Sequence, residues 1–103
     1  MTAARYLLVD RGGAGWAVAS AAVRQVRLAG DTIVLDLPGG EVAADHVIGV
    51  ALLTPRPPGE VLSKKWPFHC AGIALSSRGP VVVVDPQQPP AVLRWRDPEV
   101  SDV

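Results

Sequence analysis

The chain repeats one pattern of hydrophobic and polar positions, in which an apolar run, a glycine-containing turn and a shorter apolar run follow one another. The copies occupy residues 6–26, residues 32–50 and, more loosely, residues 71–85. In the second copy Ile33, Leu35 and Leu37 alternate with more polar neighbours, which is the period of a half-buried strand. Hairpins of this kind cannot cover their own apolar faces, so several of them must pack together. The pattern predicts an all-β fold, a small SH3-like or related partly open barrel of about six or seven strands built from repeated hairpins.

Short helical segments interrupt the expected strands at one to three places. Ser20 is a suitable cap for a helical turn that reaches Arg24, and Asp45 for a second turn before the strand over residues 47–53. One or two further turns are expected over residues 60–65, between prolines. Residues 91–95 are expected to add a short edge strand.

A single domain accounts for the whole chain. A length of 103 residues suffices for one core but not for two. We expect a flexible N-terminus over residues 1–4, one β-barrel over residues 5–96 and a flexible C-terminal tail over residues 97–103. Short hairpins rich in Val and Ala also resemble one another by composition alone, so the sequence leaves open whether the repeated unit arose by duplication.

The charge, the cysteine content and the apolar segments of the chain restrict which partners and which cellular location we expect. Ten basic and ten acidic side chains cancel, which argues against non-specific binding of nucleic acid or anionic membranes. The lone cysteine, Cys70, excludes an internal disulfide. The first residues do not form the apolar segment of a secretory signal, and no apolar stretch approaches the ~20 residues of a membrane span. A cytoplasmic protein is therefore expected.

Motifs for catalysis are missing from the sequence. It contains no G-x-S-x-G, no H-E-x-x-H, no phosphate-binding lysine motif and no dinucleotide-binding fingerprint. Together with a carboxylate, His46, His69 and Cys70 would make a minimal zinc set, but the paired spacings of zinc sites are missing. We therefore predict no enzyme activity, no cofactor and no metal, and leave a His/Cys metal site as a remote alternative.

Aromatic residues near residue 66 are the first candidates for a binding surface. Trp66 and Phe68 lie two positions apart, just after Lys64 and Lys65. Large aromatic side chains dominate binding energy where a partner desolvates them. A competing structural interpretation is a lid, in which the loop folds back and these rings plug one open end of the barrel; both interpretations stay open. A nucleic-acid-binding barrel is the alternative function, with contacts from Lys64, Lys65, Trp66, Phe68, Arg94 and Arg96.

Three segments resemble a known family. Residues 72–85, G-I-A-L-S-S-R-G-P-V-V-V-V-D, resemble the G-V-x-x-x-R-G-x-x-x-P-V-x-D segment of CheW-like chemotaxis coupling proteins, and residues 16–26 and 39–50 are similar to two further segments of that family. The segment at 39–50 precedes the R-G segment here, whereas it follows in the family, and the chain has about two-thirds of the family's length. The resemblance implies one reduced barrel rather than two, and it implies that Arg78 contacts a partner.

These observations predict a non-catalytic adaptor or scaffold for protein–protein interaction. The expected partner-binding residues are Arg78, Trp66 and Phe68. Barrel edges also offer unpaired backbone groups that a partner strand can complete. The resemblance implies a place in CheW-like bacterial signal transduction, with a signalling kinase or receptor as the partner. Self-association into a homo-oligomer is a further expectation for a domain so rich in strand edges.

Overall fold

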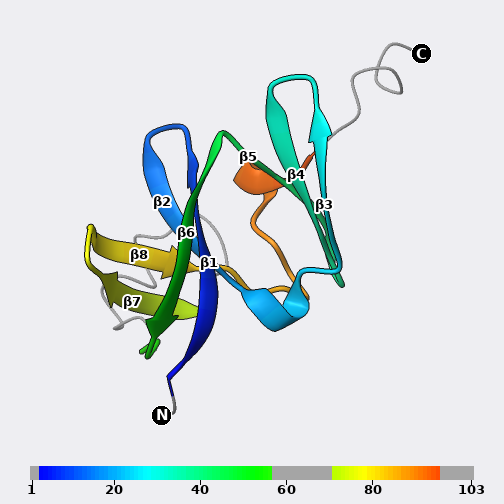
Figure 1. The fold of residues 1–103 in the computed structure, drawn as a ribbon. Coiled ribbons are helices and arrows are strands. Elements are labelled where there is room, and N and C mark those ends of the chain that lie inside the picture. The colour runs from blue at the N-terminus through cyan, green and yellow to red at the C-terminus, as the bar shows by residue number, and fades with distance from the viewer. Residues whose placement is uncertain (1–2, 57–70, 96–103) are drawn as a thin grey trace.

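In the part of the chain that the structure describes, eight strands form two sheets that pack together as a small, partly open barrel (Figure 1). The computed structural model describes residues 3–56 and 71–95. The five-stranded sheet has the order β6-β1-β2-β8-β7, with bounds β1 (Ala4–Arg11), β2 (Ala14–Ala19), β6 (His46–Leu53), β7 (Gly72–Ser76) and β8 (Gly79–Val83). The three-stranded sheet has the order β3-β4-β5, with bounds β3 (Gln25–Ala29), β4 (Thr32–Leu37) and β5 (Gly40–Ala44). Two 3₁₀ turns, η1 (Ser20–Ala22) and η2 (Ala91–Leu93), complete the fold, which confirms the predicted all-β class and its few helical turns.

The three repeated units form the predicted antiparallel hairpins β1–β2, β4–β5 and β7–β8. Their turns use glycine where the backbone must be left-handed, as at Gly12 and Gly13 with φ of 63° and 82°. Strand β6 returns to pair with β1, and β8 joins β2 in parallel through Trp16↔Val82 and Ala17↔Val83. The five-stranded sheet is therefore assembled from both halves of the chain.

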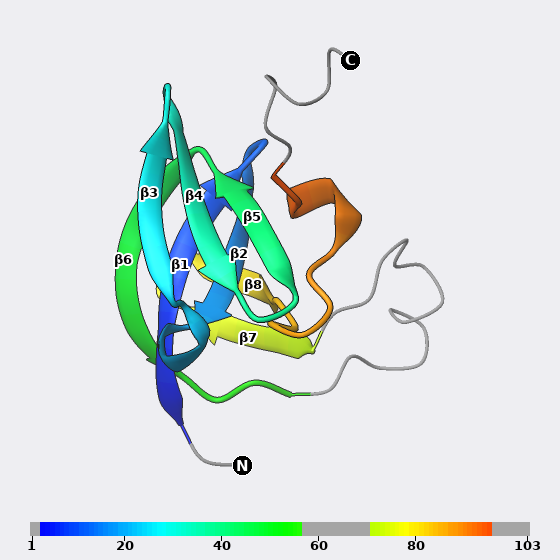
Figure 2. The same cartoon turned by 90° about the vertical axis from the view of Figure 1, so that its right-hand side faces the viewer.

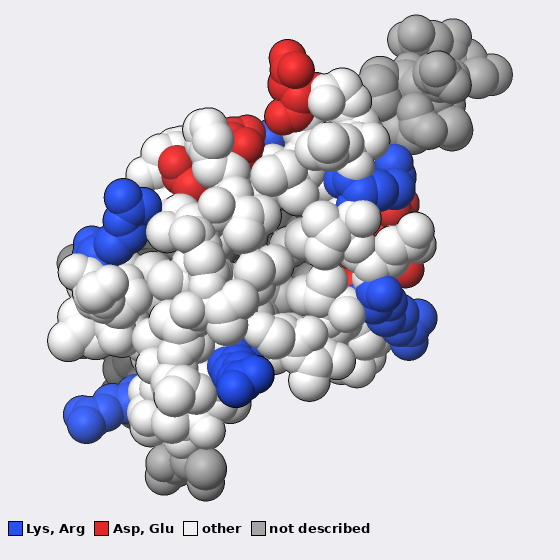
Figure 3. Space-filling view, in the orientation of Figure 1, with Lys and Arg blue, Asp and Glu red and all other residues white. Residues whose placement is uncertain are grey.

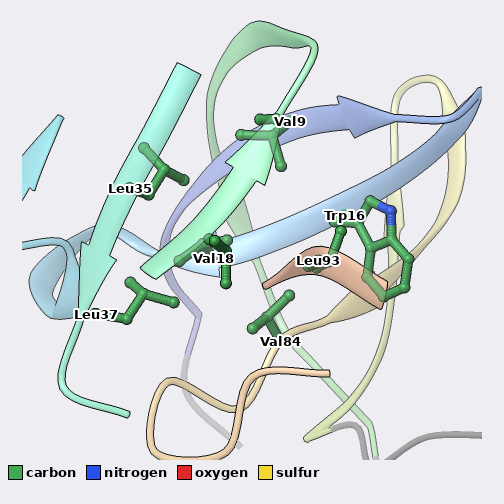
Figure 4. Close-up of a cluster of buried hydrophobic side chains, with 9 residues drawn as sticks. Val9, Trp16, Val18, Leu35, Leu37, Val84 and Leu93 are labelled. Atoms are coloured by element: carbon green, nitrogen blue, oxygen red, sulfur yellow. The ribbon is translucent and has the colours of Figure 1, made fainter. Parts of the chain in front are cut away.

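Two apolar clusters fill the fold, one on each face of the five-stranded sheet. The first lies between the two sheets and is drawn in Figure 4; it contains Val9, Trp16, Val18, Leu35, Leu37, Val42, Ala44, Val84 and Leu93. The second contains Leu8, Ala17, Leu53, Ala74, Val81 and Val83. Strands β6 and β7, at opposite edges of the five-stranded sheet, contact each other, so the sheet curls around this second cluster. Burial on both faces explains why its central strands are apolar at consecutive positions.

Three expectations about local structure are wrong. Ser20 does not cap the first helical turn, because it lies inside the turn Ser20–Ala22, whose N-cap is Ala19, and the turn does not reach Arg24. Asp45 does not start a helical turn but occupies a bend, because its carboxylate accepts hydrogen bonds from Arg11 and Gly12 instead of capping a helix. Residues 91–95 do not form an edge strand. A 3₁₀ turn forms there instead, because it brings Leu93, only 1% exposed, into the first cluster, and only Arg94 bridges to Val42 on β5. The helical turns expected over residues 60–65 lie outside the described residues.

No helix within residues 3–56 and 71–95 has the length and apolar character needed to cross a membrane.

Candidate functional site

A cleft of about 410 Å³ opens where the β1–β2 turn, β6 and the β7–β8 turn meet. Both turns lie on the left side of the molecule in Figure 1. We call this the Arg78 cleft; it is lined by Leu8, Val9, Asp10, Gly13, Gly15, Trp16, Ile48, Ser76, Arg78, Pro80 and Val81. Its residues come from five strands and two turns, so only the assembled sheet creates it.

Three buried apolar side chains form the inner part of the Arg78 cleft, whose exposed lining is otherwise mostly polar. Leu8 and Val81 belong to the second cluster and Trp16 to the first, and all three side chains are buried. Gly15 lets β2 approach β8 here, because a Cβ at this position would lie 3.3 Å from Cγ1 of Val81. Apolar side chains with a few polar groups at the margin are typical of ligand-binding sites and active sites alike.

Arg78 supplies the positive charge of the cleft from the β7–β8 turn. Its side chain is exposed, and no hydrogen bond or ion pair joins its guanidinium to another residue in the described parts of the chain. A guanidinium in this state can form charge-assisted, bidentate hydrogen bonds to a carboxylate. Arg78 is therefore placed to bind an acidic group that enters the cleft.

Ser76 holds the turn that carries Arg78, and the sequence analysis missed it. The Ser76 hydroxyl donates a 2.7 Å hydrogen bond to the Gly79 carbonyl and accepts one of 3.2 Å from the Arg78 backbone N–H. Gly79 has a φ of 114°, which favours glycine. The available signal was a serine two positions before the turn arginine, because serine hydroxyls commonly bond to nearby backbone groups in turns.

Acidic groups stand on the opposite side of the cleft, around the β1–β2 turn. Asp10 lines the cleft, and its Oδ2 lies 3.9 Å from Nδ1 of His46. Behind it, Asp45 accepts a 2.8 Å hydrogen bond from the Gly12 N–H and a 2.9 Å bond from Arg11 Nη1. The Gly12 N–H, followed by the Arg11 guanidinium, lowers the pKa of Asp45 below its ordinary value. These bonds join the turn to the start of β6, and Asp10 and Arg78 are the acidic and basic groups that line the cleft.

The charged side chains that line the Arg78 cleft are those of Asp10 and Arg78. The one hydroxyl of the cleft, on Ser76, is engaged in the turn. Within the described parts of the chain, no three His, Cys, Asp or Glu side chains are grouped as a metal ion would require. The arrangement can accept an apolar side chain against its wall and a carboxylate at Arg78.

Of the residues predicted to bind a partner, Arg78 lies in this cleft. Trp66 and Phe68 lie outside the described residues, as do Lys64, Lys65, His69, Cys70 and Arg96. Arg94 lies elsewhere in the fold, beside β5, and its Nε donates a 3.4 Å hydrogen bond to the Pro89 carbonyl.

The chain matches no protein-family model, and no curated protein sequence matches it.

Proposed function

We propose that this domain is a non-catalytic protein-interaction module that binds a partner protein through the Arg78 cleft. The observation that carries the proposal is an exposed arginine without an ion pair among the described residues, held by Ser76 beside a buried apolar wall. A partner segment that presents an apolar side chain next to a carboxylate would satisfy both parts of the cleft. Such a contact requires no chemistry from the domain itself.

The biological setting we propose is a cytoplasmic adaptor in bacterial signal transduction. Its support is the resemblance of residues 72–85 to the CheW-like segment, which includes Arg78 and the turn that presents it. In that setting the partner would be a signalling kinase or receptor. The alternative, a nucleic-acid-binding barrel, has less support because the formal net charge is zero.

Quantitative affinity capture tests the proposed cleft. The full chain would be immobilised, and proteins captured from a native lysate would be quantified for the wild type, Arg78→Glu and Arg56→Glu. We expect Arg78→Glu to reduce capture of the specific partner by about tenfold or more, since charge-assisted hydrogen bonds contribute about 1.5–3 kcal/mol. Arg56→Glu makes the same charge change on an exposed arginine that does not line the cleft.

Two outcomes would contradict the proposal. Equal capture by the wild type and Arg78→Glu would remove the cleft as the binding site. Capture of nucleic acid that falls steeply with added salt would favour the alternative function, because phosphate contacts release counterions. Circular dichroism of each variant establishes that the fold is retained.

A further inference from the structure

The two sheets have four outer edges, and three of them are protected. Arg94 bridges to Val42 and the Trp95 N–H donates to the Glu41 carbonyl, which covers β5. Arg56 exchanges backbone hydrogen bonds of 2.9 and 2.8 Å with Ile73, which covers β7. Strand β6 is interrupted where its register with β1 shifts between Leu8 and Val9. Covers and bulges of this kind are the usual means of preventing unwanted strand pairing.

Strand β3 is the fourth edge, and it is open and regular. All five of its residues pair with β4 in unbroken register, from Gln25↔Asp36 to Ala29↔Thr32. On its outer side no described residue pairs with it. An open, regular edge is a template for another strand.

The side chains of β3 are apolar on the face that the core uses. Val26 is opposite Leu35 and Leu28 is opposite Ile33, so both point to the side of the three-stranded sheet that packs on the five-stranded sheet. They nevertheless lie beyond the packed area, with 55% and 75% of their surface exposed. A strand paired with β3 would extend this face and cover both residues.

We propose that the occupant of this edge is a second copy of the chain, whose β3 pairs antiparallel with the first about a two-fold axis at Arg27. This register places Val26 of each copy opposite Leu28 of the other. The exposed apolar side chains of the two copies therefore contact each other. It faces the two Arg27 side chains toward each other, and each is already neutralised by Glu41, at 2.9 Å between Nη2 and Oε2. Strand β3 can thus pair with its own two-fold copy, which is the isologous contact of a homodimer.

Charge at the two ends of β3 is complementary under the same symmetry. Arg24 immediately precedes β3, and Asp31 follows it in the turn to β4. In the proposed register Arg24 of one copy stands beside the Gly30–Asp31 turn of the other, so opposite charges meet twice. Both residues are exposed, and neither has an ion pair among the described residues.

Strand β6, which belongs to the other sheet, presents exposed apolar side chains on the same side of the molecule as β3 (Figure 2). Figures 1 and 2 show β3 and β6 on the same side of the molecule, and the space-filling view of that side has a broad uncharged area with charged side chains mainly around it (Figure 3). Val50 pairs with Leu7, which packs on the first cluster, so the exposed Val50 also points to the side of the three-stranded sheet. A two-fold axis normal to the three-stranded sheet places the core-facing sides of both copies on the same face of the joined sheet. It therefore brings the two β6 strands to the same side of the joint.

Sedimentation of the full chain over a wide concentration range tests this dimer. We expect a concentration-dependent dimer for the wild type and a monomer for Leu28→Glu. Leu75→Glu is the matched control, because Leu75 on β7 is 77% exposed, as Leu28 is 75% exposed, yet lies outside the proposed joint. Arg78→Glu should remain dimeric, since the joint does not involve the Arg78 cleft and does not depend on its proposed function.

Charge reversal makes the test specific for the register. Arg24→Glu and Asp31→Arg should each raise the dissociation constant of the dimer by about tenfold or more, because both end contacts become repulsive. An equimolar mixture of the two variants should recover wild-type affinity, since a heterodimer restores opposite charges at both ends. A wild type that stays monomeric, a dimeric Leu28→Glu, or a mixture that fails to recover would overturn the proposal.

Discussion

The carboxylate of Asp45 accepts a 2.9 Å hydrogen bond from the guanidinium of Arg11, a residue 34 positions earlier in the chain. The same carboxylate accepts the Gly12 N–H, and the Asp45 N–H donates to the Asp10 carbonyl at 2.7 Å. The β1–β2 turn and the start of β6 are thus joined by three bonds through one residue. This junction adjoins Asp10, which lines the Arg78 cleft.

Asp45→Asn should destabilise the domain at neutral pH and reduce its sensitivity to acid. The pKa of Asp45 is lowered in the folded state, so its contribution to the free energy of unfolding is fully present above the ordinary aspartate value of about 3.9 and declines as the pH falls through the lowered value. Urea denaturation at pH 7 and pH 3 measures both effects. Asp36→Asn is the control, because its carboxylate makes no bond to another described residue.

Leu35→Ala should be among the most damaging substitutions in the core. Leu35 is fully buried in the first cluster, between the two sheets (Figure 4). Truncation removes apolar contacts and leaves a cavity, at a cost of about 3 kcal/mol in the free energy of unfolding. Leu75→Ala, at an exposed leucine, should change this quantity by less than about 0.5 kcal/mol. Similar losses for the two variants in urea denaturation would contradict the packing described.

Gly39→Ala should destabilise the domain although it adds only a methyl group. A Cβ at Gly39 would overlap the backbone carbonyl of Gln87, and Cδ of Pro89 would lie 2.8 Å from it. The Gly39 N–H also donates a 2.8 Å hydrogen bond to the Pro86 carbonyl, so the two segments cannot separate without losing that bond. We expect a cost of about 1–3 kcal/mol in thermal or urea unfolding. The neighbouring Pro38→Ala, at an exposed position, tests whether any change in this turn has the same effect.

Ser76→Ala should loosen the turn that presents Arg78. It removes the hydrogen bonds to the Gly79 carbonyl and from the Arg78 N–H, with a loss of about 0.5–1.5 kcal/mol in the free energy of unfolding. Amide exchange at Arg78 should accelerate, and partner capture should fall without any change in charge. Ser77→Ala, at the adjacent exposed serine, should alter neither measurement. Slow exchange at Arg78 in Ser76→Ala would show that the turn does not depend on this hydroxyl.

Local patterns in the sequence were sufficient to predict the hairpins. The alternation through Ile33, Leu35 and Leu37 and the glycines of the turns act over a few residues, and the structure confirms the strands they predict. The structure of residues 91–95 could not be predicted from local patterns. Whether residues 91–95 extend or coil depends on a place for Leu93 in the first cluster, to which the distant β4 and β5 contribute. Pairing of β2 with β8 is equally non-local.

The candidate site was predictable only in part for the same reason. Arg78 was singled out through a resemblance, and it does lie in a cleft. Its wall, however, is made by Leu8, Trp16 and Val81. In the sequence their apolar character predicts only that they are buried, because the cleft exists only in the assembled sheet. The engagement of Asp45 with Arg11 depends on a contact between β1 and the start of β6 that no short motif encodes.

The parallel joint between β2 and β8 has a consequence for biosynthesis. Each strand pairing among β1 to β6 uses residues that leave the ribosome before β7 does. Until the last hairpin emerges, no described residue before β7 pairs with the flank of β2 that will receive β8, although Ala17 already carries the carbonyl that later accepts the Val84 N–H. Translation thus leaves an interval in which a chaperone, or another nascent chain, can compete for that flank.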